Sequence, residues 1–272
     1  MDRRYFIGMG GAAALLGGAT AEAATLAQGA PGRSVTDFGV EPNAERDQSA
    51  AMQRAIDALA PAGQPIIIPA GMYRAGKLQL SSRAAVVGAP GLSILVAPQG
   101  SSAFEFQNKQ DVSLRGVAFI GTGLVARECR NLTIADCQVI SSGGDGLICS
   151  GSGLLVTGNR ASACARAAIW VEGDGLVSNN LISGEGQFGL RLGSAWRLGT
   201  MSVINNYIDG PEVGIGVSSS DAGYAFIAMN MITGAKNGGI RALSGDQLIG
   251  KDLTRGGSEA FRALGIAANV SL

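Results

Sequence analysis

The sequence contains no histidine, and this absence excludes several familiar kinds of catalytic site. Without an imidazole the chain cannot form a histidine-activated serine or cysteine nucleophile, a histidine general base or a histidine zinc site. Aromatic residues make up only 5% of the chain, and the formal net charge is zero with no basic block. A nucleic-acid partner is therefore disfavoured, because binding to phosphates needs a concentration of lysine and arginine.

Cysteine is scarce too, with four residues and no C-x-x-C spacing, which argues against a zinc site. The sequence leaves two readings of these thiols open. They could form a disulfide in an oxidising compartment, or they could be buried free thiols, which we favour. The four residues are Cys129, Cys137, Cys149 and Cys164.

Glycine and aliphatic residues are abundant instead, with 42 glycines and 46% hydrophobic residues in 272. Isoleucine, leucine and valine recur throughout, so we expect a folded chain rather than a disordered one. Many glycines with few aromatics favour a structure of tight turns around a thin core. The length allows one domain with a large core or two small ones.

The N-terminus resembles an export signal. Arg3 and Arg4 form a twin-arginine pair, followed by a short Gly/Ala/Leu stretch and an A-E-A sequence at 21–23 that suits a signal peptidase. The apolar stretch is too short and too glycine-rich for a stable membrane span. The pattern is similar to a twin-arginine (Tat) signal peptide over 1–23, with a linker over 24–33. This predicts the Tat translocase as a partner and a periplasmic or secreted protein, and a weak amphipathic helix is the alternative.

A repeated pattern runs through the downstream part of the chain. Six reference positions each follow a valine or isoleucine by three residues, and the first five are spaced by 22, 21, 26 and 24 residues. A period in this range is typical of a solenoid, and each coil offers three short alternating strands separated by turns. The pattern predicts an all-β fold, a parallel β-helix over 34–272, with an antiparallel β-sandwich as the rival. The reference residues are Cys137, Asn159, Asn180, Asn206, Asn230 and Asn269.

Asparagine at these reference positions has a physical reason. It tolerates left-handed backbone torsions at a sharp turn, and its amide can form hydrogen bonds along a stack of coils. We therefore predict that these residues lie at corners of the coils in the left-handed conformation and form an asparagine ladder.

The segment before the repeat resembles the opening segment of the pectate-lyase-like superfamily of right-handed parallel β-helices. The matching features are D-F-G at 37–39, A-I at 55–56 within an apolar helical stripe, and P-A-G-M-Y at 69–73. The resemblance covers about residues 34–96. It implies that a helix at about 48–60 caps the open end of the solenoid, where core side chains would otherwise be wet.

The export signal and the coils together resemble a family of twin-arginine-translocated repeat proteins. That resemblance covers nearly the whole chain. It implies export and a β-helix, and it implies no established reaction.

Chemistry is expected on the outer face of the G-[IL]-x-[VL] strands, where enzymes of this superfamily usually bind substrate and where the x side chain points outward. Trp170 could stack on a sugar ring. Arg191 and Arg241 could hold a uronate carboxylate or abstract a proton in a lyase. Asp145 and Glu172 are the nearest carboxylates, on two coils that would be neighbours. The five x positions are Ile148, Trp170, Arg191, Gly216 and Arg241.

Known catalytic sets of this superfamily are missing from these positions. The polygalacturonase branch carries N-T-D-G, D-D, G-H-G and R-I-K, where this chain has G-G-D-G at 143–146, R-A at 166–167, F-G at 188–189 and I-R-A at 240–242. The acid and base of such a hydrolase are therefore not assembled. The scattered aspartates do not suggest a calcium cluster either, so calcium is possible but unsupported, and no other cofactor or metal site is predicted.

Two hypotheses for function follow from these patterns. The first is an exported protein that binds envelope or extracellular polysaccharide. The strongest version of this hypothesis adds lyase activity. The second is a non-catalytic structural or adhesive solenoid of the cell envelope, in which the outward arginines are solvated surface and the tryptophan is an ordinary packed side chain.

Overall fold

The structure, a computed structural model, describes residues 32–220, 223–256 and 264–272. The proposed signal peptide at 1–23, including Arg3 and Arg4, lies outside the described residues, as does almost all of the linker at 24–33.

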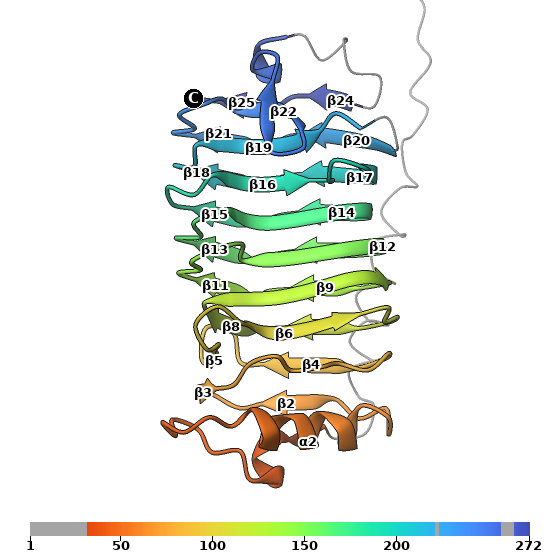
Figure 1. Cartoon of the computed structure of the whole chain (residues 1–272), viewed down its shortest axis with the longest axis vertical. Coiled ribbons are helices and arrows are strands. Elements are labelled where there is room, and N and C mark those ends of the chain that lie inside the picture. Colours follow the sequence, from red (N-terminus) through yellow and green to blue (C-terminus); the bar gives the residue numbers. More distant parts are fainter. Residues whose placement is uncertain (1–31, 221–222, 257–263) are drawn as a thin grey trace, which may run out of the picture. The chain divides into compact units, whose positions relative to one another are not determined.

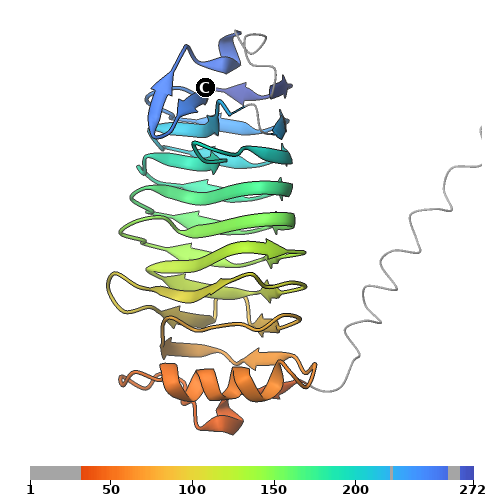
Figure 2. The ribbon, with the colours of Figure 1, turned by 45° about the vertical axis from the view of Figure 1, so that its right-hand side comes forward.

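The unit Arg33–Leu272 is a stack of coils whose short strands run across the long axis, as Figures 1 and 2 show. Each coil pairs with the next through parallel strands, which confirms the parallel β-helix and excludes the antiparallel β-sandwich. The described strands form two sheets. The larger contains β1 (Arg33–Ser34), β2 (Ile66–Ile68), β4 (Ala85–Gly88), β6 (Ser102–Gln107), β7 (Ser113–Arg115), β9 (Thr122–Arg130), β10 (Thr133–Ala135), β12 (Leu147–Thr157), β14 (Ala167–Ser178), β16 (Phe188–Leu192), β17 (Gly199–Ile204), β19 (Val213–Ser218), β20 (Gly223–Ala228), β22 (Ile240–Ser244), β23 (Gln247–Ile249) and β24 (Leu264–Ala267). The smaller contains β3 (Gly71–Arg74), β5 (Ser93–Val96), β8 (Val117–Ile120), β11 (Gln138–Ile140), β13 (Arg160–Ser162), β15 (Leu181–Ser183), β18 (Tyr207–Asp209), β21 (Met231–Thr233) and β25 (Val270–Ser271).

Each coil has three faces, which we number in chain order. The first face contains β6, β16, β19, β22 and the N-terminal halves of β9, β12 and β14, and the second contains β4, β7, β10, β17, β20, β24 and the C-terminal halves of β12 and β14. The smaller sheet is the third face. The larger sheet therefore bends around one corner of the solenoid.

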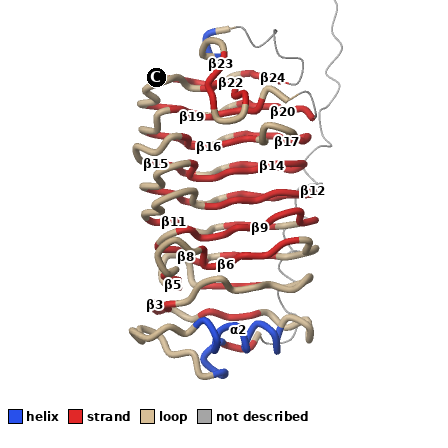
Figure 3. The backbone as a smooth tube through the Cα atoms, in the orientation of Figure 1, coloured by secondary structure: helices blue, strands red, loops and turns tan. Residues whose placement is uncertain are grey.

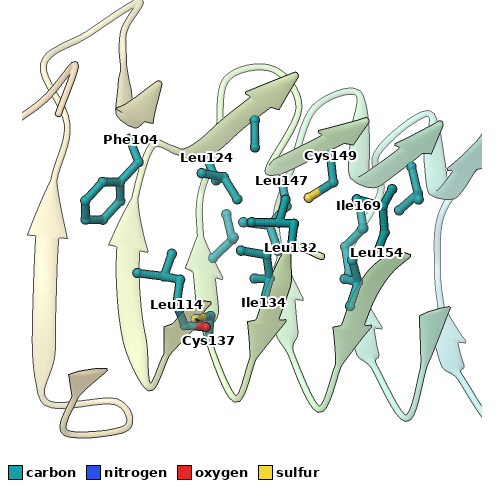
Figure 4. Close-up of a cluster of buried hydrophobic side chains, with 14 of the residues drawn as sticks. Phe104, Leu114, Leu124, Leu132, Ile134, Cys137, Leu147, Cys149, Leu154 and Ile169 are labelled. Carbon is teal, nitrogen blue, oxygen red and sulfur yellow. Dashed lines mark hydrogen bonds between the residues drawn. The ribbon is translucent and has the colours of Figure 1, made fainter. Parts of the chain in front are cut away.

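Parallel pairing in register places like side chains in columns, and the inward columns make the core. Figure 4 shows part of it, with aliphatic side chains from successive coils stacked along the axis. The inward residues of the first face illustrate this, since Leu124 pairs with Leu147 and Leu147 pairs with Ile169, all of them buried. Phe104 and Phe119 add an edge-to-face ring pair with centroids 6.2 Å apart.

A helix caps one end of the solenoid, as the resemblance implied. It is α2 (Ser49–Leu59), drawn in blue at the end of the stack in Figure 3, and it buries Met52, Ala55, Ile56 and Leu59 against the first coils. The two other described helices are single 3-10 turns, η1 (Val35–Phe38) and η2 (Leu253–Arg255). The packing of α2 keeps the apolar core side chains at this end of the solenoid from water.

The asparagine ladder is confirmed. The backbone N–H and the side-chain amide of Asn180 both donate to Oδ1 of Asn206, at 3.0 and 2.9 Å, and Asn206 repeats both bonds to Asn230. Each of these side-chain amides also donates to a backbone carbonyl of the preceding coil, Val156 for Asn180 and Val177 for Asn206. These side chains are buried, so water does not supply partners for their polar groups. The ladder gives each buried amide and carbonyl at this corner a hydrogen bond.

The left-handed conformation was predicted at the wrong residue. It is the residue before each ladder position that turns, with φ near 55° at Asn179, Asn205 and Met229 and 67° at Gly158. The ladder residues themselves do not have positive φ. The physical reason is that the turn must be complete before the ladder residue so that its side chain points inward, where its amide can reach the next coil.

Candidate functional site

The outer column predicted on the first face exists with the expected register. Ile148 pairs with Trp170, Trp170 with Arg191, Arg191 with Gly216, and Gly216 with Arg241. Parallel neighbours lie about 4.8 Å apart, so these side chains form one line along the solenoid. The alignment of coils in the sequence therefore identified which outward residues lie together.

Arg191 points away from the core of the solenoid but is not solvated surface, since only 5% of it is exposed. Its guanidinium lies 4.5 Å from the ring centroid of Trp170 and 5.8 Å from that of Phe188. One terminal nitrogen lies 2.5 Å from the carboxylate of Asp246 and 3.4 Å from the carbonyl oxygen of Gly245. The guanidinium is thus held between two aromatic rings and a carboxylate, a set that stabilises its charge out of water.

Trp170 is half-buried rather than an open ledge. Its indole N–H donates to the carbonyl of Gly193 at 2.9 Å, which fixes the ring against the start of the following loop. The ring also packs against a small apolar cluster outside the main core. This cluster contains Ala167, Phe188, Val213 and Leu243.

Arg241 is held by backbone carbonyls. Its two terminal nitrogens donate to Asn237 at 2.6 Å and to Gly250 at 2.9 Å, so the guanidinium links both ends of the segment that contains β22 and β23. Among the described residues no carboxylate forms an ion pair with it. Arg191 and Arg241 both have structural partners, and their predicted roles in binding or proton abstraction stay predictions.

Asp145 and Glu172 lie on neighbouring coils, as expected, but the two carboxylates are not side by side. Oδ1 of Asp145 accepts a hydrogen bond from the backbone N–H of Ala167 at 3.0 Å, so Asp145 is level with the start of β14, whereas Glu172 lies five residues further along the same strand. That separation is roughly 16 Å along the strand. Adjacent coils bring residues together only at the same register, and these two carboxylates are at opposite ends of the first face.

A groove instead surrounds Glu172, at the corner between the first and second faces. Ser150 pairs with Glu172 on the next coil, and Arg197 closes the groove on the following one. Neither Glu128 nor Glu172 has a side-chain hydrogen bond or ion pair to any residue that the structure describes. The groove is lined by Glu128, Cys129, Arg130, Ser150, Gly151, Ser152, Glu172 and Arg197.

The loop beside this groove carries a residue that the sequence patterns did not single out. Trp196 is 87% exposed, on the loop between β16 and β17. The adjoining Arg197 forms an ion pair with Asp174 at 3.2 Å, and Asp174 also accepts the backbone N–H of Thr200 at 2.7 Å, which anchors the end of the loop. The interval of 26 residues from Asn180 to Asn206, the longest among the first five reference residues, was the signal of this loop in the sequence.

The four cysteines are free and buried, and they do not supply a nucleophile to this face. Burial raises the pKa of the Cys137 thiol to about 12 and that of Cys164 to about 11, and it raises those of Cys129 and Cys149 as well. The reactive form of cysteine is the thiolate, which these environments disfavour at neutral pH.

Two further findings concern metal-ligating side chains and the length of the described helices. Within the described ranges, no three Cys, Asp or Glu side chains gather closely enough to hold a metal ion. None of the described helices has the length and apolar character needed to cross a membrane.

Similar solved structures share this architecture. The A-module of mannuronan C-5 epimerase AlgE4 from Azotobacter vinelandii is 16% identical, with a TM-score of 0.54 over 88% of this chain and 95% of that one. A tailspike protein of E. coli bacteriophage HK620, determined in complex with a hexasaccharide, is 13% identical, with a TM-score of 0.66 over 88% and 51%. An alginate lyase from Paenibacillus sp. is 12% identical, with a TM-score of 0.60 over 73% and 80%. At these identities the likeness establishes the fold alone.

Sequence comparison points the same way. No curated protein sequence matches the chain significantly. The family model described as the right handed beta helix region matches residues 102–252, more than half of the chain and all of the coils that form the groove and the outer column. The parallel coils, the stacked inward columns and the asparagine ladder agree with this match, and the chain belongs to the right-handed β-helix family.

Proposed function

We propose that this protein binds polysaccharide along the first face, with Trp196 as the side chain that stacks on a sugar ring. The observation that carries the proposal is a tryptophan left 87% exposed beside a groove lined by serine hydroxyls and charged side chains. An indole combines a flat apolar surface with a polar N–H, and sugar rings present apolar faces that such a surface covers well. The proteins of this fold named above, an epimerase, a lyase and a saccharide-bound tailspike, support the same class of ligand.

The proposal is for binding, with elimination chemistry as its stronger form. A lyase needs a free base next to the sugar carbon, whereas the guanidinium of Arg191 is taken up by Asp246 and that of Arg241 by backbone carbonyls. The same observation favours the second candidate, a structural or adhesive solenoid of the envelope, in which these contacts serve only stability.

We also propose that the chain is exported through the twin-arginine pathway to the periplasm or the outside of the cell. Arg3 and Arg4 and the A-E-A sequence at 21–23 support this. Expressing the full chain with and without an Arg3→Lys/Arg4→Lys double substitution tests it. The unaltered protein should be recovered processed from the periplasm or medium, and the variant should remain unprocessed inside the cell.

Binding to panels of acidic and neutral oligosaccharides, followed by calorimetry, tests the proposed ligand class. Trp196→Ala should weaken binding by about tenfold or more, because an exposed anchoring aromatic typically contributes more than 1.4 kcal/mol. Tyr224→Ala is the matched control, since Tyr224 is an exposed aromatic on the second face. Equal affinities for both variants, or no glycan bound at all, would contradict the proposal, and absorbance of an unsaturated product from uronate polymers would establish the lyase form.

A further inference from the structure

The hairpin of β22 and β23 departs from the plan of the solenoid. It is the one antiparallel pair among the described strands, and it lies within the 39-residue interval between Asn230 and Asn269. β22 pairs with β19, and β19 pairs with β16, so the hairpin starts two coils beyond Arg191. The hairpin tip, which we define as residues 244–247, nevertheless reaches back to Arg191.

The sequence makes room for this return. Gly216 lies between Arg191 and Arg241 in the outer column, and a Cβ there would come within 2.7 Å of the Phe188 ring and 2.9 Å of Leu243. The absence of a side chain at this position lets Leu243 and Phe188 meet above it. A side chain at position 216 would block this contact, so the glycine allows the hairpin tip to lie over this coil.

The two partners of the resulting ion pair are held very differently. The side chain of Arg191 is 6% exposed, fixed against two rings, and its Nε is buried without a hydrogen-bond partner among the described residues. The side chain of Asp246 is 70% exposed and sits in a turn whose neighbours Ser244 and Gln247 are exposed as well. A buried guanidinium needs a carboxylate, while an exposed aspartate on a hairpin tip loses little by returning to water.

We propose that Arg191, backed by Trp170 and Phe188, is a carboxylate-binding subsite for an acidic sugar unit, and that Asp246 occupies it until the ligand arrives. This inference rests on the proposed binding of polysaccharide along the first face. A uronate carboxylate can replace that of Asp246 on the guanidinium, whose N–H groups can donate two parallel hydrogen bonds to one carboxylate, and the unpartnered Nε supplies a donor that Asp246 leaves unused.

When an internal group occupies the subsite, the apparent affinity for an external ligand equals the intrinsic affinity multiplied by the fraction of molecules in which the subsite is open. Asp246→Asn should therefore bind oligogalacturonate about tenfold or more tightly than the unaltered protein, while a neutral oligosaccharide gains nothing. Glu185→Gln is the matched control, because it removes an exposed carboxylate that pairs with Lys236 away from this subsite. Adding Arg191→Gln to Asp246→Asn should abolish the gain.

A second measurement uses the protein without substitution, so that it does not depend on the stability of a variant. Hydrogen exchange of the backbone amides of the hairpin tip should speed up when oligogalacturonate is added and stay unchanged with the neutral oligosaccharide. If the tip stays equally protected and Asp246→Asn gains no affinity, the subsite is overturned, although binding that depends on Trp196 would still support the proposed function. If no glycan binds to any variant, the proposed function itself fails.

Discussion

At the corner between the second and third faces, single residues supply both the hydrogen bonds between coils and the sharp turn of each coil. Asn159, Asn180, Asn206 and Asn230 are buried and bonded to their counterparts on neighbouring coils, and the residue before each of them takes the left-handed conformation. Asparagine and glycine suit that preceding position, and Asn179, Asn205 and Gly158 occupy it in three coils. Met229 occupies it in a fourth, at φ 55°, although its side chain tolerates this conformation poorly.

Replacing Met229 with asparagine should therefore stabilise the protein. The expected gain in the free energy of unfolding is about 1 kcal/mol, since the strain of a left-handed residue is relieved and the exposed thioether packs against little. Denaturant unfolding at neutral pH measures it. Met231→Asn is the control, because Met231 is similarly exposed but lies in strand β21 and should gain nothing. A loss of stability at Met229 would contradict the strain argument.

The sequence predicted the ladder and missed which residue turns, for a physical reason. Periodicity marks positions that recur, and both Asn206 and the residue before it recur, so the pattern alone does not separate them. The left-handed preference of asparagine favoured the wrong one of the two, because burial and hydrogen bonding, rather than torsion preference, select the ladder residue.

Among the elements, the short inserted segment that follows β22 and contains β23 and η2 was the least predictable. Its helix η2 begins after Asp252, whose carboxylate accepts hydrogen bonds from the backbone N–H groups of Gly239, Ile240 and Thr254 and from the Thr254 hydroxyl. One aspartate thus ties η2 to the start of β22. The sequence offered no repeated pattern for this segment, because it occurs once and returns antiparallel to the coils.

The pKa of Asp252 reflects this arrangement and predicts a pH dependence. Burial acts to raise the pKa, but the hydrogen bonds outweigh it and hold the pKa below that of an ordinary aspartate. The folded state then binds fewer protons than the unfolded state, so the stabilisation is present above the usual aspartate pKa of about 3.9 and is lost as the pH falls through the lower folded value.

Asp252→Asn should accordingly lower the free energy of unfolding at pH 7, by roughly 1 to 3 kcal/mol, and by less at acid pH. Unfolding curves of both proteins at pH 7 and in the acid range give the difference directly. Asp57→Asn serves as a comparison, because Asp57 is an exposed helix residue bonded to Gln53. A difference that stays constant with pH would show that the carboxylate's charge is not what holds this segment.

For the whole molecule, the decisive contacts are those between successive coils, and a column of glycines at the corner of the larger sheet shows how close they are. Gly151, Gly173, Gly199 and Gly223 all have positive φ, and each faces the backbone of the coil before it. A Cβ added at Gly173 would lie 1.9 Å from the carbonyl oxygen of Gly151. The coils can stack at this corner only if the column carries no side chains.

Gly173→Ala should therefore destabilise the protein by at least about 2 kcal/mol, since it combines backbone strain at φ 121° with a clash that no side-chain rotation relieves. Gly144→Ala is the matched control, because a Cβ there meets nothing within 4 Å and φ is not positive, so its effect should stay within about 0.5 kcal/mol. Thermal unfolding of the two variants tests the argument, and similar melting temperatures would refute it.

The arrangement of whole coils was the most predictable part of the protein, and the site was the least. Recurring apolar positions fixed which strands stack, and the capping helix was expected from its apolar stripe and from the resemblance to the superfamily. Exposure of single outward side chains was not predictable, because it depends on segments that do not repeat. The hairpin tip covers Arg191, and the loop after β16 presents Trp196.

The ion pair between Arg191 and Asp246 has a mechanical consequence. A solenoid whose coils contact only their neighbours can be peeled apart under tension one coil at a time, each step breaking a single row of bonds. Here Arg191 on β16 forms an ion pair with Asp246 in the hairpin that begins with β22, two coils further on. A pull along the axis must then break this contact as well as the hydrogen bonds between successive coils, so we expect the coils from β16 to β22 to separate at a higher force than coils that contact only their neighbours.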